Sequence, residues 1–312
     1  MTSKSRITIV NVLVILIFLL LVLTLGCGWG KQQTSGSGAK LMVVASVYPV
    51  YEFARQVGGE HVAVTMLVPA GVEPHSWEPT AKDLTTLRKA KLFLYHGAGL
   101  EPWVDKMITP QVLGGAKAVE ISKNIEVMTA ENGHGHAQAM DPHIWLDPVL
   151  AQKEVDNILA ALCAVDPANA ELYRQNADRF KAELETLHNE YTAALKTVRQ
   201  RTFITNHAAF GYLARRYNLE QVAVMGLSPD AEPTPETLAQ IIDFCRKKQV
   251  KYIFLEPLVN PRVANTIAKE TGVKTLILDP LDGMTDEDLR QGKNYLFIMR
   301  QNLANLKLAL ME

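Results

Sequence analysis

From Leu41 onward, short runs rich in β-branched residues alternate with segments of helical periodicity, and this alternation restricts the fold more than any other feature of the sequence. Such alternation is typical of parallel sheets covered by helices, because parallel strands need long crossover connections. Residues 41–165 are therefore expected to form one α/β lobe. Its predicted strands are Leu41–Val47, Val62–Val68, Lys91–Tyr95 and Ala118–Ile121, and its clearest helical patterns are Pro49–Val57 and Thr80–Ala90.

The alternation returns after Arg201 and predicts a second α/β lobe over residues 201–312. The predicted strands of this lobe are Thr202–Thr205, Gln221–Met225, Lys251–Leu255 and Lys274–Leu278. Its predicted helices are Ala208–Tyr217, Pro235–Lys248, Asn260–Thr271 and a last one that runs from Thr285 to Leu310.

Residues 166–200 lie between the two lobes and have a different pattern. Asp166 and Pro167 supply a helix-capping residue and a proline suited to the first helical turn. The apolar residues that follow are spaced alternately four and three apart, which predicts one long amphipathic helix of about 32 residues. They are Tyr173, Ala177, Phe180, Leu184, Leu187, Tyr191, Ala194 and Val198. Such a stripe could form a coiled-coil seam or pack along the two lobes of its own chain.

The amino-terminal segment indicates export from the cytoplasm. Lys4 and Arg6 precede an apolar run over residues 7–25, which is typical of a signal peptide, here residues 1–26, or of a retained membrane helix. Cys27 follows this run directly and resembles the lipidated cysteine of a bacterial lipoprotein. Residues 27–40 are rich in glycine and polar residues and are expected to be a flexible tether that carries the lipid.

Composition and charge exclude several classes of function. A hydrophobic content of 48% in 312 residues is enough for one large or two medium-sized domains. Without residues 1–26 the chain has 30 basic and 33 acidic residues, which gives no electrostatic footprint for nucleic acid. No glycine-rich phosphate loop follows any predicted strand. Cys163 and Cys245 lie in predicted helices of different halves and are expected to be free thiols, with a disulfide between them as the alternative.

Four residues are candidate metal ligands, because their loops follow predicted strands or precede a helix. Open parallel sheets bind ligands beyond the carboxyl ends of their strands. Imidazole nitrogens and a carboxylate oxygen suit a divalent transition metal, and four of them complete a tetrahedral zinc shell. Two of the candidates fall in each half of the chain: His75, His143, His207 and Asp279.

The segments around these residues, in their order along the chain, resemble the metal-binding subunits of bacterial ABC importers for zinc and manganese, from about Leu41 to the end. Pro74-His75-Ser76-Trp77-Glu78-Pro79 matches the segment that supplies the family's first ligand. Asp141-Pro-His143-Ile-Trp-Leu-Asp147-Pro and His207-Ala-Ala-Phe-Gly-Tyr are similar to the second and third, and Leu278-Asp279-Pro-Leu to the fourth. The resemblance implies two α/β lobes with parallel-rich sheets, joined by one long backbone helix, with the metal held in the cleft between them.

The resemblance also implies a role and a place for the protein. The chain is expected to be a monomeric, lipid-anchored solute-binding protein on the outer face of the bacterial cytoplasmic membrane, extracellular or periplasmic. It is expected to hand its metal to an importer permease and to catalyse no reaction. His207 favours zinc, because manganese relatives tend to have a carboxylate at that position, although manganese or iron stays open. A surface zinc hydrolase and an adhesin are the alternatives from other classes.

Three further features belong to the expected site. Zinc members of the family often have a histidine-rich loop before the second ligand, and His134 and His136 are a reduced form of it, or incidental members of a solvated loop. Glu232 and Glu256 follow predicted strands and could accept hydrogen bonds from ligand imidazoles, or could be ordinary cap and surface acids. Because neutral imidazoles bind metal, capture is expected to weaken below a pH of about 6–6.5.

Overall fold

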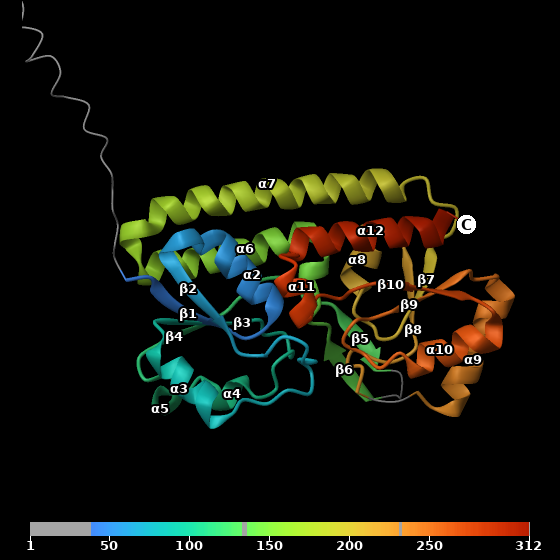
Figure 1. Ribbon diagram of the computed structural model, residues 1–312, viewed down its shortest axis with the longest axis horizontal. Coiled ribbons are helices and arrows are strands. Elements are labelled where there is room, and N and C mark those ends of the chain that lie inside the picture. The colour runs from blue at the N-terminus through green and yellow to red at the C-terminus, as the bar shows by residue number, and fades with distance from the viewer. Residues whose placement is uncertain (1–38, 133–135, 231–232, 312) are drawn as a thin grey trace, which may run out of the picture. The chain divides into compact units, whose positions relative to one another are not determined.

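Two four-stranded parallel sheets are the framework of the protein (Figure 1). The computed structural model describes residues 39–132, 136–230 and 233–311. The first sheet has the order β2-β1-β3-β4 and the second the order β10-β9-β7-β8. Their strands are β1 (Leu41–Ala45), β2 (Val62–Met66), β3 (Leu92–Tyr95), β4 (Lys117–Glu120), β7 (Thr202–Thr205), β8 (Glu220–Ala223), β9 (Tyr252–Leu255) and β10 (Lys274–Ile277). The fold class predicted from the sequence is confirmed.

Helices cover these sheets and link them. Those of the first half are α2 (Tyr48–Gly58), α3 (Ala81–Lys89), α4 (Val104–Met107), α5 (Pro110–Leu113) and α6 (Pro148–Val165). Those of the second half are α7 (Ala170–Leu195), α8 (Gly211–Arg216), α9 (Pro235–Lys248), α10 (Arg262–Thr271), α11 (Asp286–Arg290) and α12 (Tyr295–Met311). Short 3-10 turns at Gly59–His61, Ile144–Leu146 and Pro167–Asn169 complete the helical segments.

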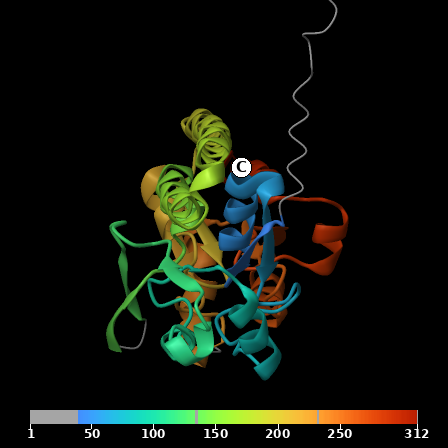
Figure 2. The same ribbon diagram turned by 90° about the vertical axis from the view of Figure 1, so that its left-hand side faces the viewer.

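The long helix α7 lies along α6 and α12 (Figures 1 and 2). The apolar positions that predicted this helix are buried from Tyr173 to Tyr191, and Leu195 replaces Ala194 as the buried residue of the last turn. Tyr191 also donates its hydroxyl hydrogen bond to the backbone oxygen of Met299 in α12, at 2.7 Å. The apolar stripe therefore packs against other helices of the same chain. This is the second of the two alternatives that the sequence left open, and the coiled-coil seam is not formed.

The structure differs from the sequence-based prediction in three elements. The long helix α7 has 26 residues and not about 32, because Pro167–Asn169 form a separate 3-10 turn and the helix ends at Leu195. The last helix, predicted to be continuous from Thr285, is divided into α11 and α12, because Gly292 takes a left-handed conformation with φ of 69°. The polar segment before His143 forms a short antiparallel hairpin of β5 (Thr129–Asn132) and β6 (His136–Met140), which the sequence did not predict.

Residues 40–312 form one compact unit. The signal segment 1–26, Cys27 and most of the tether lie outside the described residues. None of the helices within the described ranges is long and apolar enough to cross a membrane. Cys163 and Cys245 are both free thiols.

Candidate metal site

Loops at the carboxyl ends of strands from both sheets meet at one point. His75 lies in the loop after β2, His207 two residues after β7, and Asp282 in the loop after β10. His143 precedes the 3-10 turn Ile144–Leu146, which leads into α6. Three loops that follow sheet strands and one segment that precedes a 3-10 turn thus direct four candidate metal ligands toward each other.

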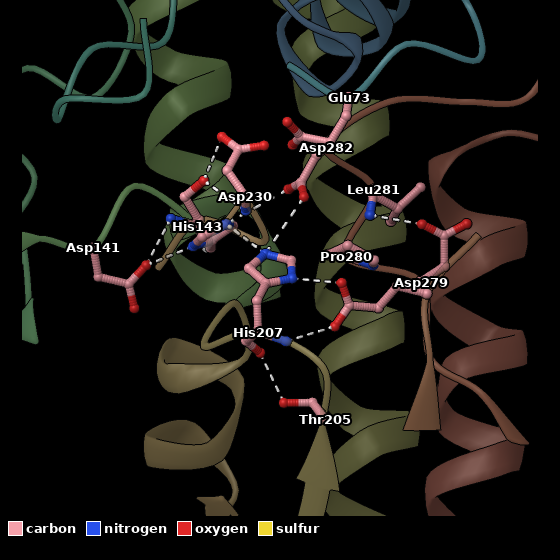
Figure 3. A network of polar contacts seen from close by, with 12 residues as sticks. Glu73, Asp141, His143, Thr205, His207, Asp230, Asp279, Pro280, Leu281 and Asp282 are labelled. Atoms are coloured by element: carbon pink, nitrogen blue, oxygen red, sulfur yellow. Dashed lines mark hydrogen bonds and ion pairs between the residues drawn. The ribbon is translucent and has the colours of Figure 1, made fainter. Parts of the chain in front are cut away.

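The four side chains lie close enough to share one metal ion. One ligand atom from each of His75, His143, His207 and Asp282 lies within 4.8 Å of all the others. The Nε2 atoms of His143 and His207 are 3.4 Å apart, and each lies 3.7 Å from a carboxylate oxygen of Asp282 (Figure 3). Zinc–nitrogen bonds of about 2.0–2.1 Å at tetrahedral angles place two nitrogens about 3.4 Å apart. The histidine pair therefore has the spacing of one edge of a zinc tetrahedron.

Two buried carboxylates fix the orientation of two of these imidazole rings. The Nδ1 atom of His143 lies 2.8 Å from Oδ1 of Asp141, and that of His207 lies 2.5 Å from Oε2 of Glu256. The same carboxylates accept the backbone N–H groups of His143 and His207, at 2.9 and 3.0 Å. Because a carboxylate lies at each Nδ1, each ring directs its Nε2 atom toward the position of the metal. Glu256 therefore lies where the sequence placed it, beside a candidate ligand.

Burial gives the first two histidines a neutral form. It lowers the pKa of His75 and of His143 well below the usual value, and the neighbouring histidines lower both further. Nε2 of His75 is buried and has no hydrogen-bond partner among the described residues. Neutral imidazole is the form that binds a metal, so neither ring has to lose a proton at neutral pH.

His207 and Asp282 bind protons more tightly than usual. Burial opposes the charged form of His207, but the Glu256 carboxylate outweighs it and raises the pKa of His207 to about 9. Burial raises the pKa of Asp282 to about 8, although the positive charge of His207 acts in the opposite direction. A bound divalent cation would replace these two protons and supply the positive charge that they now provide.

The structure places Asp282, and not the predicted Asp279, beside the three histidines. Oδ1 of Asp279 accepts the backbone N–H of Leu281 at 2.8 Å, and Asn302 of α12 hydrogen-bonds both backbone groups of Asp279. Leu281 has a positive φ of 60°. Asp279 thus stabilises a tight turn, and this turn directs the carboxylate of Asp282 into the site (Figure 3).

Trp145 ties the His143 loop to the second half of the chain. Its indole N–H donates to the backbone oxygen of Pro280 at 2.8 Å, and its own backbone oxygen accepts the hydroxyl of Tyr295 at 2.5 Å. The ring centroids of Trp145 and His143 are 5.4 Å apart. Because Trp145 is completely buried, the positions of His143 and of the Asp282 turn depend on one another.

The His75 loop and the Asp282 loop also touch directly. The backbone N–H of Gly71 donates to the backbone oxygen of Met284 at 2.8 Å. A Cβ atom on Gly283 would lie 3.3 Å from the backbone oxygen of Val72 and 2.9 Å from a methyl carbon of Leu258. Contacts between the two halves thus border the site on this side, and a side chain at position 283 would crowd them.

The remaining predicted site residues are only partly described. His134 and Glu232 lie outside the described residues, and His136 begins strand β6. The sequence-based prediction did not include Asp141, Asp282 and Glu73, although the sequence around each of them has a recognisable pattern. Asp141 and Glu73 stand in two matching acid-Pro-His segments, and Asp282 is the second acid of Asp279-Pro-Leu-Asp282, next to a glycine.

Comparisons with known proteins agree with this geometry. The family model described as "Zinc-uptake complex component A periplasmic" matches residues 43–309. The high-affinity zinc uptake system protein ZnuA of Bacillus subtilis (strain 168) is 41% identical over 286 residues, which are 89% of this chain and 90% of that protein. The zinc-binding lipoprotein AdcA of Streptococcus pneumoniae is 39% identical over 277 residues, 86% of this chain but only 55% of AdcA, so the chain spans about half of that relative.

Solved structures of zinc-binding and metal-transporting proteins also match this chain. The Zn(II)-bound ZnuA-like domain of S. pneumoniae AdcA superimposes with a TM-score of 0.76 at 38% identity and covers 88% of this chain and 100% of that domain. The laminin-binding protein Lmb of Streptococcus agalactiae, described as bifunctional with adhesin and metal-transporting activity, has a TM-score of 0.79 at 38% identity and covers 86% and 99%. Since the family model and these relatives each match more than four-fifths of the chain, this protein belongs to the zinc-uptake complex component A family.

Proposed function

We propose that this protein captures a zinc ion with His75, His143, His207 and Asp282 and delivers it to the permease of an ABC importer. The observation that carries this proposal is the convergence of these four side chains, from loops of both sheets, within 4.8 Å of one another. Membership of a zinc-uptake family supports both the cargo and the delivery step.

The ligand set favours zinc as the cargo. Three neutral imidazoles and one carboxylate suit zinc, whereas manganese prefers sites dominated by oxygen. The 3.4 Å spacing of the His143 and His207 nitrogens supports a four-coordinate ion of this size. A site of this kind would bind zinc more tightly than manganese or iron(II) by intrinsic affinity alone.

The same ligand set supports binding without catalysis. Catalytic zinc sites keep one position open for water, whereas four protein ligands fill a tetrahedral shell. We therefore place the protein among non-enzymatic carriers, and not among zinc hydrolases.

We further propose a monomer on the outer side of the cytoplasmic membrane, anchored by a lipid on Cys27. Residues 41–165 and 201–312 would act as the two lobes, with 166–200 as the segment that joins them. The family's periplasmic description supports the location, and the lipoprotein AdcA supports the anchor.

Substitution of the two neighbouring aspartates tests the ligand set. We expect Asp282→Asn to weaken zinc binding more than about 100-fold, since loss of a ligand should exceed the effect of losing a supporting residue. Asp279→Asn should have a much smaller effect, because an asparagine oxygen can still accept the N–H of Leu281. Competition with a chromogenic chelator measures both affinities, and native mass spectrometry under zinc and manganese competition identifies the cargo.

His207→Ala provides the second arm of this test and should weaken zinc binding at least as strongly as Asp282→Asn. Unchanged affinity in either of these variants would refute the four-ligand assignment. A larger loss in Asp279→Asn than in Asp282→Asn would return the fourth position to Asp279.

Adhesion is the second candidate function, because Lmb is described as both an adhesin and a metal transporter. Binding of the purified protein to immobilised laminin tests it. Binding that survives in His207→Ala and Asp282→Asn would make adhesion independent of metal capture, and no binding would remove this candidate.

A further inference from the structure

Glu73 lies beside the metal site but outside the group of four ligands. It precedes Pro74 and His75 in the loop after β2. Its Oε2 atom accepts the backbone N–H of Ser76 at 3.2 Å and the Ser76 hydroxyl at 3.4 Å. Its Oε1 atom is buried and has no hydrogen-bond partner among the described residues. One carboxylate oxygen is therefore fixed by the loop, and the other is free to meet a ligand.

A small cavity joins Glu73 to the metal site. Its volume is about 10 Å³, enough for one water molecule, and the residues that line it include four acids: Glu73, Glu256, Asp279 and Asp282. Asp282 is only 5% exposed, and its Oδ1 atom also lacks a hydrogen-bond partner within the described part of the chain. Two acids that each have a carboxylate oxygen without a hydrogen-bond partner, one from each half of the chain, thus line the same cavity.

Glu73 is the outermost of these four acids. The other three are at least nine-tenths buried, whereas Glu73 is partly exposed to solvent. Because Glu73 is more exposed than Asp282, a cation that enters from solvent on this side would meet Glu73 before Asp282. Carboxylates that line a narrow opening with low-dielectric walls concentrate cations and speed their association.

We propose that Glu73 is a transient ligand that contacts the entering divalent cation through its carboxylate and passes it to Asp282 and the histidines. The proposal rests on the proposed function and concerns the rate of capture. At each step one carboxylate or imidazole ligand replaces one metal-bound water, so the ion changes neither its charge nor its oxidation state. The four ligands already complete the final shell, and Ser76 keeps Glu73 at the opening.

Stopped-flow measurement of zinc association and dissociation tests this role in Glu73→Gln. The glutamine oxygen can still accept the hydrogen bonds of Ser76, so the loop keeps its support while the charge is lost. We expect association to slow about tenfold at low ionic strength and dissociation not to accelerate. The difference between the wild type and the variant should shrink as salt is added, because screening weakens the attraction.

Two further variants make the result specific. Glu60→Gln makes the same change in net charge in the 3-10 turn Gly59–His61, before β2, and should leave association unchanged. Glu73→Asp keeps a carboxylate at the opening and should restore association to within about threefold of the wild type. Thermal unfolding of each metal-free variant checks that the fold is retained.

The possible outcomes distinguish a failure of the role proposed for Glu73 from a failure of the proposed zinc-capture function. Unchanged association in Glu73→Gln, an effect confined to dissociation, equal slowing in Glu60→Gln, or no recovery in Glu73→Asp would each overturn the role of Glu73. Failure of the wild type to bind one zinc ion would overturn the proposed function itself.

Discussion

At the scale of single residues, the site depends on carboxylates that hold histidines. Asp141 and Glu256 each accept both the backbone N–H and the ring Nδ1–H of one histidine. Each carboxylate therefore fixes both the position and the tautomer of its ring. His75 has no carboxylate contact of this kind among the described residues, and its ring lies 5.4 and 5.9 Å from the rings of His143 and His207.

The pKa values of His207 and Asp282 predict how capture depends on pH. A metal must displace the proton of His207 below a pH of about 9 and that of Asp282 below a pH of about 8. Apparent affinity should therefore fall as the pH falls from 9, well above the window of about 6–6.5 expected from a free imidazole. His75 and His143 add no proton near neutrality, because their pKa values are lowered.

Calorimetry in buffers of different ionisation enthalpy counts these protons. We expect about two protons to be released per zinc ion at pH 7, and fewer as the pH approaches 9. Glu256→Gln should lower the count by about one, since the Glu256 carboxylate keeps His207 charged. A count of zero at pH 7 in the wild type would contradict the protonated state of the site.

The sequence alone identified three of the four grouped residues because His75, His143 and His207 stand in short segments that resemble the family's ligand segments. Asp279 and Asp282 both follow β10, and the sequence pattern led to the choice of Asp279. Only the turn between them determines which carboxylate lies beside the histidines. The left-handed φ of Leu281 and the contacts of Asn302 decide between them, and neither can be predicted from local sequence.

At the scale of elements, all eight predicted strands of the two sheets exist, and their ends differ by only a few residues from the predicted ends. Strong periodicity made them predictable. The β5–β6 hairpin has polar residues without clear alternation, so the sequence did not predict it. The break at Gly292 was missed, although Leu289 is the only apolar residue in the segment 285–294 and a glycine is itself a signal for the end of a helix.

The contact between the His75 and Asp282 loops leads to a prediction for Gly283. We expect Gly283→Val to increase the rate of zinc dissociation about tenfold, because overpacking against Val72 and Leu258 would push the two loops apart. Gly226→Val is a matched control, since a Cβ atom there meets nothing within 4 Å. Dissociation into excess chelator, followed by stopped flow, measures both rates. Equal rates in Gly283→Val and the wild type would show that this contact does not retain the metal.

At the scale of the whole molecule, both halves contribute to one core. The largest group of buried apolar residues includes strands of both sheets and helices α2, α6, α7 and α12. Phe53 of α2 packs edge-on against Tyr295 of α12, with ring centroids 5.0 Å apart. The site thus lies on loops that a shared core holds in place, and a metal would add one more link between the halves.

This arrangement predicts that zinc stabilises the fold as a whole. A ligand that binds only the folded state at 100 times its Kd adds about 2.7 kcal/mol to the free energy of unfolding. For a folded unit somewhat larger than 250 residues we expect Tm to rise by about 5 °C. Differential scanning calorimetry of the metal-free and zinc-loaded protein measures the shift, and chelator should reverse it. Asp282→Asn at the same zinc concentration should show little shift. If a single lobe held the ion, part of the unfolding transition would stay at the metal-free temperature, whereas a site shared by both halves moves the entire transition.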